Sequence, residues 1–89
     1  METKRFSVNK DTLFEGRNEQ YALVYDDTHY HNHSAFDERG NWEYINEKHI
    51  YEQVEYFNDL HEMNKRQIEL SKISNKHYSN FIFITNDNV

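Results

Sequence analysis

The chain has 89 residues, a formal net charge of −6 and no cysteine, so we expect one small domain over residues 1–89 without disulfides or thiolate metal sites. Its aromatic fraction of 16% supplies enough bulky apolar surface for a core, which argues against intrinsic disorder. The excess of acidic residues argues against direct nucleic-acid binding, because that function needs a basic surface.

The longest apolar run is FIFI, at residues 81–84. A run of this length cannot cross a membrane, so no membrane association is expected. No apolar stretch follows the basic residues near the N-terminus, and a secretory signal is therefore not predicted. A soluble, cytoplasmic protein is the expectation.

Short strands are predicted in the first half of the chain, where polar and apolar residues alternate and β-forming residues gather. They cover residues 4–8, 21–25 and 29–36, whereas residues 42–45 fit either a fourth strand or the beginning of a helix. Residues 9–19 are expected to form an irregular loop that packs Leu13 and Phe14 onto the core.

Two turns are predicted between these strands. The pair Asp26-Asp27 suits a turn because carboxylate side chains accept hydrogen bonds from the nearby backbone. Residues 38–41 contain Gly40, which can adopt a positive φ. These turns would separate three short strands from one another.

A long helix is predicted over about 46–75. Ile50, Val54, Phe57 and Leu60 are spaced by 4, 3 and 3 residues, as on one face of a helix, and Asn46 is a plausible N-cap. Such a helix would span roughly 40 Å at 1.5 Å per residue and would protrude from a small domain. Residues 80–85 then form a C-terminal strand, which gives an α+β fold with an antiparallel sheet of three to five strands.

The predicted helix has acidic residues in its first half and basic residues in its second half, which complements the helix dipole. The same pattern also favours antiparallel association of two copies, because each acidic half would then meet a basic half. We therefore predict a helix-mediated homodimer. Its seam has heptad-like spacing and consists of Ile50, Val54, Phe57, Leu60, Asn64 and Gln67.

Three histidines alternate in the stretch THYHNH, at His29, His31 and His33. Alternate residues of a strand share a face, so two of these imidazoles could bind one zinc ion together with Asp27, Asp26 or a distant histidine. The distant candidates are His49, His61 and His77. The alternative is a solvated strand face without a metal, whose charge changes near the histidine pKa of about 6.5.

No catalytic motif is present: no nucleophile elbow surrounds a serine, and the two isolated glycines cannot form a phosphate-binding loop. The prediction is a non-enzymatic protein without a cofactor. Tryptophan and tyrosine are enriched at interface hot spots, which favours partner contact for Trp42, Tyr44, Tyr51 and Tyr56.

The segments KRFSV, YALVYDD and NEKHIYEQVEYFNDLHEMNKRQIEL together resemble small uncharacterised archaeal or viral reading frames. These proteins also have a short β-meander followed by a long charged helix, in some cases with coiled-coil character. The resemblance covers most of residues 4–70 and implies no activity and no site residues.

The function expected from the sequence is a protein–protein interaction module, as a homodimer and with a basic protein as a further partner. One alternative is an acidic nucleic-acid mimic that inhibits a basic host factor. Another is a metal-binding protein that uses the histidines.

Overall fold

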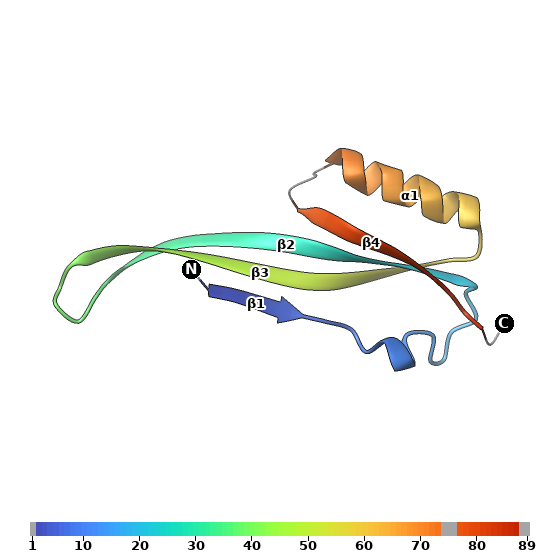
Figure 1. Ribbon diagram of the computed structural model, residues 1–89, viewed down its shortest axis with the longest axis horizontal. Coiled ribbons are helices and arrows are strands. Elements are labelled where there is room, and N and C mark those ends of the chain that lie inside the picture. The colour runs from blue at the N-terminus through green and yellow to red at the C-terminus, as the bar shows by residue number, and fades with distance from the viewer. Residues whose placement is uncertain (1, 74–76, 88–89) are drawn as a thin grey trace.

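A curled, four-stranded mixed sheet dominates the fold (Figure 1). The computed structural model describes residues 2–73 and 77–87. Its elements in chain order are β1 (Glu2–Phe6), the short 3₁₀ helix η1 (Lys10–Thr12), β2 (Tyr21–Phe36), β3 (Trp42–Phe57), the helix α1 (Leu60–Ile73) and β4 (Tyr78–Thr85). The strands lie in the order β1-β3-β2-β4, with β1 parallel to β3 and the other neighbours antiparallel. The expectation of a purely antiparallel sheet was therefore wrong.

The predicted long helix over 46–75 was also wrong. Residues 42–57 form β3, which pairs with β2 along its whole length, and the helix covers only 60–73. Asn46 is therefore a strand residue, and Asp59 caps the helix instead, because its Oδ1 accepts a hydrogen bond from the backbone N–H of His61 at 3.0 Å. Ile50 and Val54 share a face in a strand as well as in a helix, so their spacing did not distinguish the two structures.

The turn predicted at Asp26-Asp27 does not exist. β2 runs unbroken from Tyr21 to Phe36 and joins the two strands that were expected separately. Asp26 bonds to Arg5 and Asn80, and Asp27 lies 3.1 Å from His29. Both carboxylates thus find partners in the extended chain.

The second predicted turn is present and joins β2 to β3. The side chain of Asp37 accepts hydrogen bonds from the backbone N–H groups of Arg39 and Asn41, at 2.9 and 2.8 Å. Gly40 has a φ of 81°, a conformation that favours glycine. The C-terminal strand expected over 80–85 lies within β4.

Hydrophobic residues pack on both faces of the sheet near the end where Tyr21 pairs with Phe57, away from the turn between β2 and β3. α1 places Met63 and Leu70 on Leu23 and Tyr25, and we call this side the helix face. The loop around η1 places Leu13 on Ala22 and Val24 on the opposite side, which we call the loop face. Because side chains alternate along a strand, odd-numbered residues of β2 and β3 lie on the helix face and even-numbered ones on the loop face.

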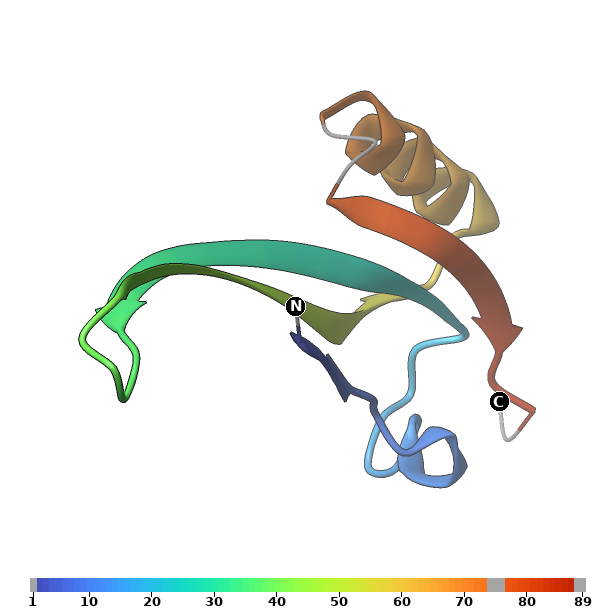
Figure 2. The same ribbon diagram turned by 60° about the vertical axis from the view of Figure 1, so that its left-hand side comes forward.

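The hairpin of β2 and β3 extends beyond the packed part of the sheet. The pairing of β1 begins at Glu2–Glu47, and β4 pairs with β2 only as far as Asp27–Tyr78. Residues 32–46 therefore form a two-stranded projection, which we call the arm. Figure 2 shows the arm bending toward the side of the sheet on which η1 lies, so its concave side is the loop face.

The molecule is elongated because of the arm. Its principal extents are 60 × 28 × 14 Å, and its radius of gyration over Cα atoms is 17.7 Å, whereas a compact chain of this length has about 12 Å. A protruding element was expected, but it is the hairpin and not a helix. In the described part of the chain, no helix is both long and apolar enough to span a membrane.

Candidate functional site

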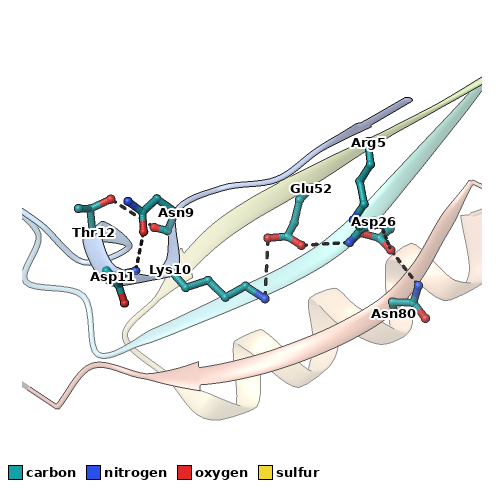
Figure 3. Close-up of polar contacts among 8 residues, drawn as sticks. All are labelled: Arg5, Asn9, Lys10, Asp11, Thr12, Asp26, Glu52 and Asn80. Atoms are coloured by element: carbon teal, nitrogen blue, oxygen red, sulfur yellow. Dashed lines mark hydrogen bonds and ion pairs between the residues drawn. The ribbon is translucent and has the colours of Figure 1, made fainter. Parts of the chain in front are cut away.

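A polar row crosses all four strands on the loop face, between the core and the arm (Figure 3). Arg5 on β1 donates to Asp26 on β2 at 2.9 and 3.1 Å and to Glu52 on β3 at 3.3 Å. Asn80 on β4 donates to Oδ2 of Asp26 at 2.8 Å, the oxygen that also accepts from Nη1 of Arg5. Asn80 reaches this position because the pairing of β2 with β4 is irregular between Val24 and Asp26, and its own φ is 55°.

Hydrogen bonds and nearby cations favour the charged form of Asp26. Burial alone would raise the pKa of Asp26, but the hydrogen bonds from Arg5 and Asn80 and the charges of Arg5 and Lys10 outweigh it and lower that pKa. Glu52 lies between Arg5 and Lys10, with Nζ of Lys10 at 3.8 Å. The row therefore has the character of a structural ion-pair network that fixes both outer strands to the sheet.

The loop face of the arm is aromatic. Phe36, Trp42 and Tyr44 lie on it, Tyr30 lies at its base, and each is between 53% and 67% exposed. Phe36 and Trp42 are directly opposite each other, with ring centroids 4.8 Å apart in an edge-to-face arrangement. These four residues are the aromatic face of the arm, and two of them, Trp42 and Tyr44, were expected from the sequence to contact a partner.

The other two aromatic residues named for partner contact lie elsewhere. Tyr51 stacks on Phe6 at 4.8 Å on the helix face. Tyr56 donates a hydrogen bond to the carbonyl oxygen of Leu13 at 2.5 Å and has the guanidinium of Arg17 over its ring at 3.8 Å. Both therefore hold the fold together.

Histidines gather on the opposite, helix face, at the base of the arm. His29, His31 and His33 share this face, as predicted from their alternation, and across the hairpin they meet Glu47 and His49. The ring centroids of His31 and His49 are 4.9 Å apart. The carboxylate of Glu47 lies 3.1 Å from Nε2 of His49 and 3.6 Å from Nε2 of His33.

The histidines act on Glu47 as hydrogen-bond partners. The hydrogen bond with His49 is the largest cause of the lowered pKa of Glu47, and His33 adds to it. Of the distant histidines considered as ligands, only His49 joins the cluster, since His61 lies on α1 and Nδ1 of His77 contacts the Thr28 carbonyl oxygen at 2.8 Å. No group of three or more histidine, aspartate or glutamate side chains within residues 2–73 and 77–87 is arranged to hold a metal ion.

The residues predicted as a dimer seam do not form one surface. Ile50, Val54 and Phe57 lie on β3, the first two on the loop face and the third on the helix face. The remaining three, Leu60, Asn64 and Gln67, lie on α1. The seam was derived from a continuous helix and loses its basis with that helix.

The chain is thus a small β-rich protein with an arm that has an aromatic face, and histidines gather at the base of the arm on the opposite face. No protein-family model, no curated protein and no solved structure shows significant similarity to it.

The polar row was missed by the sequence analysis because its members come from different strands, and Glu47 was missed as a member of the histidine cluster for the same reason. The aromatic face had a signal in the sequence. Tyr30, Phe36, Trp42 and Tyr44 all occupy even positions, which share a face in a hairpin whose register pairs even residues with even residues, as Phe36 with Trp42.

Proposed function

We propose that the protein is a non-enzymatic interaction module whose arm binds a basic segment of a partner protein. The observation that carries this proposal is the aromatic face: four large, exposed side chains on one side of a two-stranded arm. A two-stranded hairpin is at best marginally stable in water by itself, so a partner on this face would also stabilise the arm. Aromatic residues are the usual anchors of protein interfaces.

The charge around the arm supports a basic partner. The arm carries three acidic residues, Asp37, Glu38 and Glu43, and one basic residue, Arg39. Arginine and lysine side chains of a partner would bind the aromatic rings through cation–π contacts and be attracted by the acidic residues nearby. The chain already uses such a contact internally, where Arg17 covers Tyr56.

Neither alternative function has a comparable observation in its favour. For a metal-binding protein, the described residues contain no group of three or more histidine, aspartate or glutamate side chains arranged to hold the ion. For a nucleic-acid mimic, the acidic residues would have to present an unpaired negative surface. Asp26, Glu52 and Glu55 are instead held in ion pairs with arginines.

Trp42 provides a direct test because it is the one tryptophan in the sequence. We expect an arginine-rich peptide to change the fluorescence of Trp42 in a saturable way, and a glutamate-rich peptide of equal length to have no such effect. Added salt should weaken the interaction because it screens exposed charges. The variant Tyr44→Ser keeps the reporter and should weaken binding about fivefold or more, as expected for an aromatic interface anchor.

The matched control is His33→Ser, which alters the opposite face of the same arm and should leave the affinity unchanged. Equal weakening by both variants, or equal responses to both peptides, would contradict recognition by the aromatic face. Absence of any saturable response to the arginine-rich peptide would refute the basic partner.

A further inference from the structure

The two edges of the sheet differ in a way that points to a second interaction surface. β1 is short and carries Lys4 and Arg5, and charged residues of this kind protect an edge from pairing with another strand. β4 is the opposite edge, and its sequence, YSNFIFIT, contains no charged residue and no proline. An uncharged, apolar edge strand is a template for pairing with another chain.

Exposed apolar side chains accompany this edge on both faces. Ile82 and Phe83 are 44% and 47% exposed, and as neighbours in a strand they point to opposite faces of the sheet. In the described residues β4 pairs with β2 alone, so its other side is available.

α1 adds an exposed apolar residue on the same side. Arg66 of α1 donates to Glu55 of β3 at 2.8 Å, so the helix flank that carries Arg66 faces β3. At 100° per residue the flank on the other side of the buried Met63 and Leu70 carries Leu60, with the polar residues Asn64, Gln67 and Ser71, whereas Ile68 points away from the sheet. Because the strand order places β4 opposite β3, this flank lies along the free edge, and Leu60 is 50% exposed on it.

We propose that β4 pairs with β4 of a second copy of the chain, antiparallel, to form a continuous eight-stranded sheet. A twofold axis perpendicular to the sheet brings two identical edges together as antiparallel strands. The uncharged sequence supports self-pairing because no like charges would then face each other across the new ladder. The irregular pairing and the positive φ of Asn80 confine the regular part of the edge to residues 81–85.

The flank of α1 completes this interface. A stable dimer buries roughly 1,200–2,000 Å² in total, more than five paired residues provide. Leu60, which is half exposed on this flank, supplies additional apolar area. This dimer uses a different surface from the aromatic face of the arm, so the two proposals stand or fall separately.

Light scattering over a concentration series tests the proposal, and we expect the full chain to approach twice the monomer mass of 11.0 kDa. The substitution Ile82→Lys places a charge on the edge and should raise the dissociation constant about tenfold or more. The matched control is Ile73→Lys, which introduces the same charge at a residue that is 64% exposed on the β3 side of α1. The control should dimerise like the unmodified chain.

Hydrogen exchange of the unmodified chain gives a second test that needs no variant. We expect exchange within residues 81–85 to slow as the protein concentration rises, because outward-facing amides become paired. A monomer at all concentrations, equal dimerisation of both variants, or exchange in β4 that does not depend on concentration would overturn the proposal.

Discussion

Asp26 combines a buried carboxylate with partners from two other strands. It is 4% exposed, and Arg5 and Asn80 both donate to it. We expect Asp26→Asn to lower the free energy of unfolding by about 1–3 kcal/mol at neutral pH, because the charge-assisted hydrogen bonds of a buried carboxylate are lost. Urea unfolding of both proteins measures this difference.

The pH dependence of this difference follows from the lowered pKa of Asp26. Since the folded-state pKa lies below the ordinary value of 3.8, the stabilisation is complete above that value and is lost as the pH falls through the folded-state pKa. The two proteins should therefore converge in strong acid. Glu38→Gln, in the exposed turn, is the control and should change the stability by less than about 0.5 kcal/mol. Equal stability of Asp26→Asn and the unmodified chain at neutral pH would contradict a stabilising role for the row.

The sequence could not have predicted the role of Asp26. Its partners Arg5 and Asn80 lie 21 and 54 positions away, and the local rule for two adjacent aspartates predicted a turn instead. His29, His31 and His33 were placed correctly on one face because strand alternation is a local property. Their main partners, Glu47 and His49, became visible only with the register of the hairpin.

At the level of elements, α1 is held to the sheet by few side chains. Leu70 and Met63 are its buried residues, and Arg66 adds the ion pair with Glu55. We expect Leu70→Ala to lower the free energy of unfolding by about 2–4 kcal/mol because it leaves a cavity between α1 and β2. Ile73→Ala, at an exposed position of the same helix, should cost less than about 0.5 kcal/mol beyond any change in helix propensity. Similar unfolding midpoints for the two variants would show that α1 is not anchored through Leu70.

Residues 42–57 form a strand although a helix was predicted from about residue 46, and this difference has a physical explanation. Their apolar spacing fits both periodicities at Ile50 and Val54, and short windows of this kind are ambiguous. The composition favoured a strand, since β-branched and aromatic residues are frequent there. Pairing with the 16-residue strand β2 decides in favour of a strand. The sequence analysis did not identify β2 as one strand because it predicted a turn at Asp26-Asp27. One wrong turn therefore affected both strands of the hairpin.

On the scale of the whole molecule, the arm and the free edge of β4 determine the shape of any assembly. The arm extends beyond the Tyr78 end of β4. Antiparallel pairing of two β4 strands reverses one copy relative to the other, so the two arms would project from opposite ends. A dimer joined through the aromatic faces of the arms would instead bring the arms together.

Small-angle scattering separates these arrangements. We expect Ile82→Lys, as a monomer, to have a radius of gyration near the 17.7 Å of the single chain, since a compact chain would give about 12 Å. The unmodified dimer should have a maximum dimension clearly above the 60 Å of one chain, because its arms lie at opposite ends. A dimer whose maximum dimension stays near 60 Å would contradict pairing through β4. A compact monomer would mean that the arm folds back onto the sheet in solution, which would cover the surface proposed to bind a partner.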